Sequence, residues 1–275
     1  MKSSILLIAL TAGVCLAAEE RNTVRRTFAV IPLNAKLIVD TVDGNVVVSG
    51  YSGHEIQVTV NERWQADNSD KLQEARREVR LDMTQEGSAV RLYVDGPFRC
   101  GRNCTDWNGD RGYNARFDFD VKVPVETVLD LKTVNGSRIE VSDVNGDYSV
   151  RNVNGSVSLK GIGGSGAAHT VNGRVAVAFK RNPKEPCSFK TVNGEIDAAF
   201  QPGFSADLRV KTFNGEAWTD FEATTLPVAA ETSERQGTRF VYKRNRVSRL
   251  RVGSGGPEHS FETLNGSIQI VSKGQ

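Results

Sequence analysis

One five-residue phrase decides the fold: it stands as KTVNG at residues 132–136, HTVNG at 169–173 and KTVNG again at 190–194. Its variants are RNVNG at 151–155, KTFNG at 211–215 and ETLNG at 262–266. Successive phrases start 19, 18, 21, 21 and 51 residues apart. A period near 20 residues indicates a repeat architecture, in which each unit buries its apolar side against its neighbours.

Each repeat divides into two short segments closed by turns. Turn residues step along the chain at intervals of about nine or ten residues, at Asn135, Asn145, Asn154, Gly163 and Asn172. Between them apolar and polar residues alternate, as in Val175, Val177 and Phe179, which is the period of a half-buried strand. Two strands per unit are therefore expected, and the class is all-β.

Two architectures fit this pattern. Asn-Gly between strands is a strong hairpin signal, which favours an antiparallel meander. A β-solenoid with coils of about 20 residues explains why the same phrase recurs at every second turn, because equivalent residues stack at about 4.8 Å. We favour the solenoid, with glycine supplying unusual backbone angles and asparagine amides bonding along the stack. The predicted turn ladder comprises Asn135, Asn154, Asn172, Asn193, Asn214 and Asn265.

The phrase Thr-Val-Asn-Gly-x-Ile/Val at this spacing resembles the DUF4097 β-strand repeat proteins and the related head-GIN-domain adhesin-like proteins. The resemblance runs from about Phe28 to Ser272 and includes the segments 37–48 and 253–268. It implies an exported, right-handed, single-stranded β-helix of the cell envelope. It implies no defined activity, since adhesion is a label for the family more than a demonstrated mechanism.

The N-terminus is typical of a secretory signal. Lys2 is followed by the apolar stretch 5–10 and by small residues, with cleavage expected after Ala17 or Ala18. The apolar stretch is shorter than the roughly 20 residues that span a bilayer, and no transmembrane span is expected. The formal net charge of +2 gives no reason to expect a nucleic-acid partner. The protein is therefore predicted to be periplasmic, secreted or on the cell surface.

The chain is divided into a signal peptide at 1–18, an N-terminal β region at 19–125 and the Asn-Gly repeat region at 126–275. One amphipathic helix is expected at about 70–81, with Asp70 as N-cap, covering an edge or an open end of the core. The last interval of 51 residues holds about 30 extra residues, so a projecting loop or hairpin is expected at about 222–252.

Cysteines and acidic residues suggest two local sites. Cys100 and Cys104 are close enough in sequence to form a disulfide in an oxidising compartment, and Cys187 is expected to be a small buried residue. Alternating acids in the loop Asp106–Asp110 resemble the start of a calcium loop, but Arg111 stands where an EF-hand has glycine. A polar turn is the alternative for that loop.

No catalytic set, cofactor or metal site is predicted, because no known catalytic motif occurs and no acidic position repeats through the units. If the units stack, Lys132, Arg151, Lys190 and Lys211 form a strip suited to an anionic envelope polymer or glycan; a solvated charged face is the alternative. Phe213 occupies the slot of Val134, and the sequence predicts it buried, with Phe213→Ala costing about 3–5 kcal/mol.

The predicted function is an exported, non-catalytic, adhesin-like binding or structural module. The alternatives are a carbohydrate-active β-helix enzyme and an envelope-stress or regulatory partner.

Overall fold

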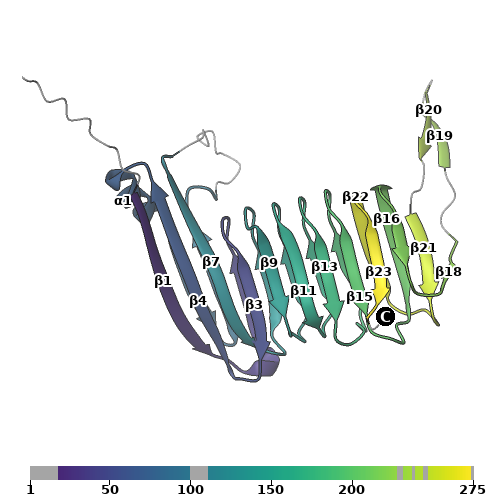
Figure 1. Cartoon of the computed structure of the whole chain (residues 1–275), viewed down its shortest axis with the longest axis horizontal. Helices are drawn as coiled ribbons and strands as arrows, with labels where there is room; N and C mark the ends of the chain where they lie inside the picture. Colours follow the sequence, from purple (N-terminus) through teal and green to yellow (C-terminus); the bar gives the residue numbers. More distant parts are fainter. Residues whose placement is uncertain (1–17, 100–110, 228–231, 237–238, 244–246, 274–275) are drawn as a thin grey trace, which may run out of the picture.

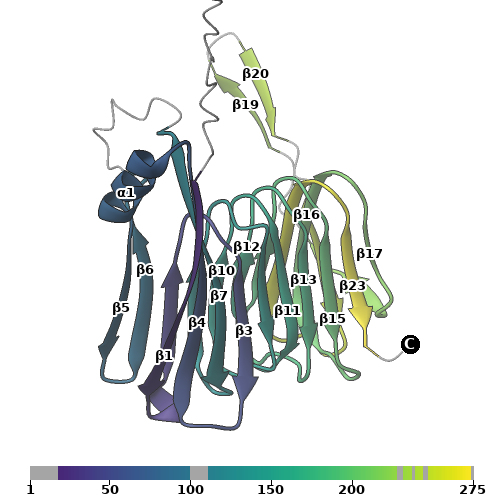
Figure 2. The same cartoon turned by 60° about the vertical axis from the view of Figure 1, so that its left-hand side comes forward.

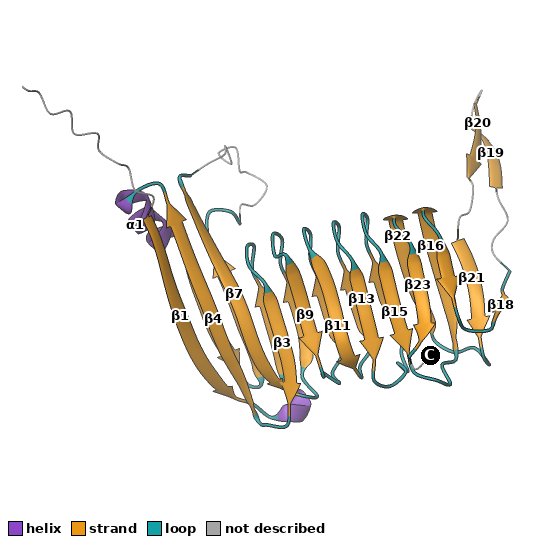
Figure 3. Ribbon diagram, viewed as in Figure 1, coloured by secondary structure: helices purple, strands orange, loops and turns teal. Residues whose placement is uncertain are grey.

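The computed structural model describes residues 18–99, 111–227, 232–236, 239–243 and 247–273. Most of these residues lie in strands, which run across the long axis of the molecule and stack side by side along it (Figures 1 and 3). Two large sheets face each other (Figure 2) and enclose an apolar core from one end of the stack to the other.

The first sheet has ten strands. In spatial order they are β1 (Ala18–Ala29), β4 (Glu55–Ala66), β7 (Tyr113–Pro124), β3 (Val46–Tyr51), β9 (Arg138–Ser142), β11 (Ser156–Ile162), β13 (Val175–Phe179), β15 (Ile196–Phe200), β23 (Ile268–Ser272) and β17 (Ala217–Thr219).

The second sheet has eleven strands. In spatial order they are β18 (Ala223–Thr225), β21 (Val247–Val252), β16 (Ala206–Asn214), β22 (Glu258–Asn265), β14 (Ser188–Lys190), β12 (Gly166–His169), β10 (Tyr148–Arg151), β8 (Val128–Lys132), β2 (Lys36–Asp40), β6 (Ala89–Asp95) and β5 (Arg80–Glu86). A separate hairpin of β19 (Thr232–Gln236) and β20 (Arg239–Lys243) stands off the stack (Figure 1).

The central strands pair in parallel, and each repeat unit contributes one strand to each sheet. Arg151 of β10, for example, aligns with Lys132 of β8 on one side and with His169 of β12 on the other. Antiparallel pairs occur at the ends, where β1, β4 and β7 join the first sheet and β5 and β21 join the second. The all-β class agrees with the sequence prediction. The single-stranded β-helix is not confirmed, because the strands form two mixed sheets in a sandwich-like arrangement.

The threonine of the repeated phrase explains why the units stack. Its side chain points inward and donates a hydrogen bond to the glycine carbonyl of the adjacent unit, at 2.8–3.3 Å. Asn152 replaces threonine in one unit and makes the equivalent bond through Nδ2. The donors are Thr133, Asn152, Thr170, Thr191, Thr263 and Thr212, which bond to Gly44, Gly136, Gly155, Gly173, Gly194 and Gly266 in that order. Each of these glycine carbonyls, and each side chain that bonds to it, thereby has a hydrogen-bond partner within the protein.

The glycine of the phrase is required by space as well as by backbone angle. Gly155 has φ +153°, and a Cβ there would lie 2.0 Å from the carbonyl oxygen of Gly136 in the adjacent unit. Such a contact forces the backbones of two units apart.

The order of units in space differs from their order in the chain at both ends. The last unit, β22 and β23, lies between the unit of β14 and β15 and the unit of β16 and β17. Likewise the first unit, β2 and β3, lies between β6 and β7 on one side and β8 and β9 on the other. The outermost repeat unit is therefore attached through a unit that folds back from the C-terminus.

The segment predicted as an insertion at 222–252 is divided in the structure. Its first and last parts form β18 and β21, which extend the second sheet by antiparallel pairing. Only β19 and β20 form an independent hairpin. The boundary between the N-terminal and repeat regions stays a prediction, since β2 and β3 pair directly with β8 and β9.

The helix α1 spans Ser69–Glu78, three residues shorter at its C-terminus than predicted. Asn68, not Asp70, is the N-cap, and its side chain accepts a hydrogen bond from the Lys71 amide. The helix ends at Val79, whose backbone is extended, because the chain enters β5 and pairs with β6. The buried side chains of Ala75 and Val79 pack on the core, and the helix lies at the N-terminal end of the stack (Figure 3).

Aromatic side chains fill the C-terminal half of the core. Phe179 stacks on Phe200, Phe200 on Phe204, and Phe189 on Phe261, with ring centroids 3.9–5.3 Å apart. His259 lies fully buried beside Phe200 and Phe204.

His259 and Cys187 form a polar pair inside this core. The Cys187 amide donates to His259 Nδ1 at 3.1 Å, and the Tyr148 hydroxyl lies 4.0 Å from the Cys187 sulfur. Cys187 is a buried free thiol, and burial raises its pKa. Burial also lowers the pKa of His259 to about 4, because the ring would have to carry a charge among aromatic side chains.

The first prediction concerns two glycines. We expect Gly155→Ala to lower the free energy of unfolding by more than about 3 kcal/mol, because strain and a backbone clash act together. Gly203→Ala is the control: Gly203 has φ +77° and open space around it, so about 1 kcal/mol of strain is expected. Urea denaturation of both variants measures the difference. Equal costs would show that adjacent turns are not in close contact.

The second prediction concerns pH. An unfolded histidine binds a proton below about pH 6.5, whereas folded His259 does so only near pH 4. Stability should therefore fall as the pH drops from about 6.5 to about 4, by about 3 kcal/mol from this residue. Urea denaturation at several pH values, for the wild type and for His259→Phe, isolates the effect. A variant with the same pH slope as the wild type would contradict it.

Candidate functional site

The repeated phrase forms one long edge of the molecule, where the second sheet turns into the first (Figure 1). The asparagine amides bond to one another along it, each Nδ2 donating to the Oδ1 of its neighbour at 2.7–3.0 Å. The order in space is Asn135, Asn154, Asn172, Asn193, Asn265 and Asn214. We call this column the asparagine ladder. All six predicted residues lie in it, although Asn265 precedes Asn214.

The residue before each asparagine, together with Val42 before Asp43, forms a second column, which we call the aliphatic row although Phe213 is aromatic. Its members are apolar and exposed or half-exposed: Val42, Val134, Val153, Val171, Val192, Leu264 and Phe213. Phe213 is 51% exposed, so its predicted burial is wrong. The threonine before it points inward, and strand alternation therefore turns the next side chain outward. Sequence alternation from buried Leu131 through Thr133 could have shown this.

The basic residues predicted as a strip form the cation row on the second sheet. Strand register places Lys132, Arg151, His169, Lys190, Glu262 and Lys211 side by side in that order. Because they alternate with inward threonines, they lie beside the aliphatic row. Three parallel columns thus follow the same edge: amides, aliphatic side chains and charges.

The cation row is not uniform. Glu262, from the inserted last unit, separates Lys190 from Lys211 and pairs with both, at 3.7 and 2.9 Å. The bond from Lys211 holds the pKa of the Glu262 carboxyl below its usual value. His169 has a lowered pKa, chiefly through burial and then through its positive neighbours, and is neutral at pH 7. Lys132 pairs with Asp130 at 3.8 Å, whereas Arg151 pairs with no described carboxylate.

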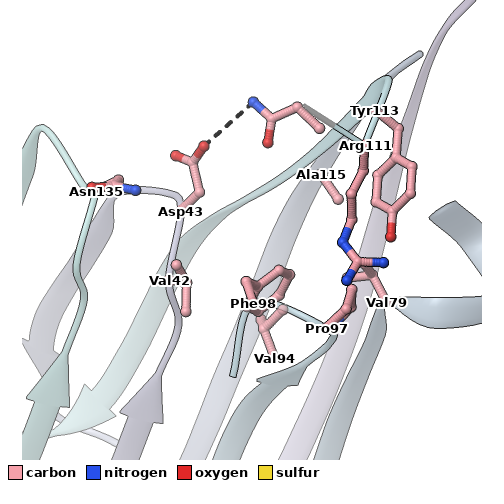
Figure 4. A pocket seen from close by; sticks show the side chains of 11 residues that line it. Val42, Asp43, Val79, Val94, Pro97, Phe98, Arg111, Tyr113, Ala115 and Asn135 are labelled. Carbon is pink, nitrogen blue, oxygen red and sulfur yellow. Dashed lines mark hydrogen bonds between the residues drawn. The ribbon is translucent and has the colours of Figure 1, made fainter. Parts of the chain in front are cut away.

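A cavity of about 320 Å³ lies at the N-terminal end of these columns (Figure 4). Val42 of the aliphatic row and Asn135 of the asparagine ladder both line it. Its walls are the apolar Val79, Val94 and Phe98. The columns therefore lead into a cavity built from segments that are distant in the sequence.

The mouth of this cavity carries polar groups. Asn114 donates to Asp43 across it, and Arg111 extends into it beside Tyr113 (Figure 4). Both Arg111 and the Tyr113 hydroxyl bind Glu78 at the end of α1. Burial and the neighbouring carboxylate raise the pKa of Tyr113 to about 12, so the phenol stays protonated.

Two predictions, a disulfide and a calcium loop, cannot be placed. Cys100, Cys104 and the Asp106–Asp110 loop lie outside the described residues. Among the residues that the structure describes, no group of three or more His, Cys, Asp and Glu side chains is arranged to hold a metal ion. No described helix is long and apolar enough to cross a membrane.

Comparisons with known proteins give few matches. No family model matches the chain, and no curated protein matches it. Similar solved structures include a candidate cell adhesion protein from Clostridium sporogenes, 11% identical, with 92% of this chain and 100% of that chain covered and a TM-score of 0.43. A candidate adhesin from Bacteroides fragilis is 9% identical, with 92% and 97% covered and a TM-score of 0.40. A candidate lipid-binding protein from Parabacteroides distasonis has the same identity and coverage, with a TM-score of 0.26. Likeness at these scores says nothing of ligand or activity, for which the chain's own residues must be used.

The third prediction tests the exposure of the aliphatic row. Phe213→Ala should change the free energy of unfolding by less than about 1 kcal/mol, because the ring is half exposed. Phe261→Ala is the matched control on the neighbouring strand, and its fully buried ring should cost about 3–5 kcal/mol. Urea denaturation compares them. If Phe213→Ala lowers the free energy of unfolding as much as Phe261→Ala does, Phe213 packs in the core and the exposure of the row is contradicted.

Proposed function

We propose that this protein is an exported, non-catalytic, adhesin-like binding module of the cell envelope, built as a β-solenoid. The N-terminal signal-like segment supports export, and the parallel stacking of the units supports the solenoid. Its ligand is an extended anionic polymer that lies along the turn edge.

One observation carries the proposal: three chemically distinct columns run parallel along the same edge through six units. Stacked strands are about 4.8 Å apart, so these units present a track of roughly 24 Å. Threonine, asparagine and glycine of the phrase make the hydrogen bonds and close contacts between units, whereas the apolar residue turns its side chain toward the surface. Its recurrence in every unit is therefore best explained by contact with a partner.

The charges favour an anionic ligand. Lys132, Arg151 and Lys190 lie on three of four consecutive strands, and the formal charge of the six-residue row is +3 when His169 is neutral. The protein as a whole is nearly neutral, so attraction is confined to this row. Each exposed contact contributes about 1 kcal/mol or less, and binding depends on their number and spacing.

The fourth prediction tests the cation row by retention on immobilised alginate at low salt. We expect the triple variant Lys132→Gln, Arg151→Gln and Lys190→Gln to bind about ten- to hundred-fold more weakly. Glu262→Gln should bind more tightly, because it removes the acid that neutralises two lysines. High salt should abolish most of the retention.

The control is Arg138→Gln, Lys160→Gln and Arg174→Gln, which removes the same charge from the outer face of the first sheet. Its retention should stay close to that of the wild type. If both triple variants lose retention equally, only net charge matters and the row is not a site. If neither loses retention, the polymer binds elsewhere.

A further inference from the structure

A second opening lies at the N-terminal end of the molecule, away from the turn edge. A cleft of about 510 Å³ opens between β1, the edge strand of the first sheet, and β5, the edge strand of the second. On one side the sheets are joined by bonds from Arg26 to the Met83 carbonyl and from Gln85 to the Ala29 carbonyl. Arg76 of α1 also lines the cleft. The cleft is thus a bounded slot between two sheets.

The floor of the slot is the N-terminal end of the core. Trp64, Val79 and Phe117 line it and are almost completely buried by the rest of the protein. Leu81 and Met83 of β5 form a partly buried wall. An apolar chain that enters between the sheet edges would therefore contact Leu81 and Met83, above the buried aromatic residues.

Polar groups occur in the slot at unusual positions. Glu62 points inward on β4, where its neighbours in the same row are apolar, and it is only 9% exposed. It accepts hydrogen bonds from Asn22 and from the Trp64 indole, both at 3.3 Å, and these donors are neutral. Acidic side chains are rarely this buried, so Glu62 adds a polar group to an otherwise apolar interior.

Three arginines surround this interior. Arg76 lies 5.0 Å from the Trp64 ring and pairs with Glu20, and Arg80 pairs with Asp82 and Asp95. Arg26 differs, because its guanidinium donates to a carbonyl and pairs with no described carboxylate. A guanidinium at the rim of an apolar slot is suited to a carboxylate or a similar anion.

We propose that this slot binds a single-chain amphiphile with an anionic headgroup. The apolar tail lies between Val24 of β1 and the pair Leu81 and Met83 of β5, close to Trp64, and the headgroup binds Arg26 at the rim. The slot volume is in the range of small-molecule sites, which combine apolar walls with few polar groups. This site is independent of the turn edge, which carries its own ligand.

Tryptophan fluorescence tests the proposal directly. The chain has three tryptophans, so the double variant Trp107→Phe and Trp218→Phe leaves Trp64 as the only one. Dodecanoate carrying bromine on its tail, added below its micelle concentration, should quench Trp64 emission in a saturable way. Unlabelled dodecanoate should reverse the quenching by competition, and dodecanol should compete at least ten-fold more weakly.

Variants on one strand assign the headgroup contact. Arg26→Gln should weaken dodecanoate binding about ten-fold and leave dodecanol binding unchanged. Arg25→Gln is the matched control, because strand alternation turns Arg25 to the opposite face. Glu62→Gln should tighten dodecanoate binding, since it removes a negative charge from the slot.

Three outcomes would overturn the proposal: no saturable quenching of Trp64, equal competition by dodecanol and dodecanoate, or equal loss in the Arg25 and Arg26 variants. Should Arg26→Gln fail to fold, the Glu62→Gln measurement decides, because an unchanged or weaker affinity there also contradicts an anionic ligand. These outcomes leave the proposed turn-edge function untouched, because that function is tested separately by alginate retention.

Discussion

The contact between the turns of adjacent units is the constraint on which the rest of the structure depends. An inward threonine hydroxyl bonds to the glycine carbonyl of the next unit, and an outward asparagine amide bonds to the next asparagine. Neither bond is strong alone, since a hydrogen bond contributes about 1 kcal/mol net. The inward bond occurs six times along the edge, from five threonines and Asn152, and the asparagine bond occurs five times. Together they fix the register of both sheets. Register then determines which side chains are buried and which are exposed.

That register also explains the composition of the edge. The threonine side chain points inward and the asparagine lies in the turn. Strand alternation therefore directs the side chain of the residue between them away from the core. It is nevertheless valine, leucine or phenylalanine in every phrase. The same alternation brings the charged residue two positions earlier onto the same face. A surface with recurring chemistry is thus a direct consequence of a repeating structural requirement.

The ends of the stack show how the molecule departs from a simple repeat. The C-terminal unit folds back between two earlier units, and this places Glu262 between Lys190 and Lys211. Glu262, which comes from the last repeat phrase in the sequence, therefore divides the cation row. At the other end, α1 and the long antiparallel strands cover the core only in part. The cavity and the slot lie on either side of Val79, where this cover is incomplete.

The sequence by itself determined the all-β class, the position of most repeat strands and the residues of the asparagine ladder, because one phrase that recurs at intervals near 20 residues favours an arrangement in which equivalent residues are neighbours. It placed one helix within a few residues, but not its end, since pairing of Leu81 with Val94 overrides the helical pattern. It misplaced Phe213, because the threonine before it points inward and strand alternation then turns the phenylalanine outward. Only the tertiary structure decided the order of the terminal units, the interruption of the cation row by Glu262, and the slot beside Trp64. Each of these depends on contacts between residues far apart in the chain, and such contacts leave no local pattern in the sequence.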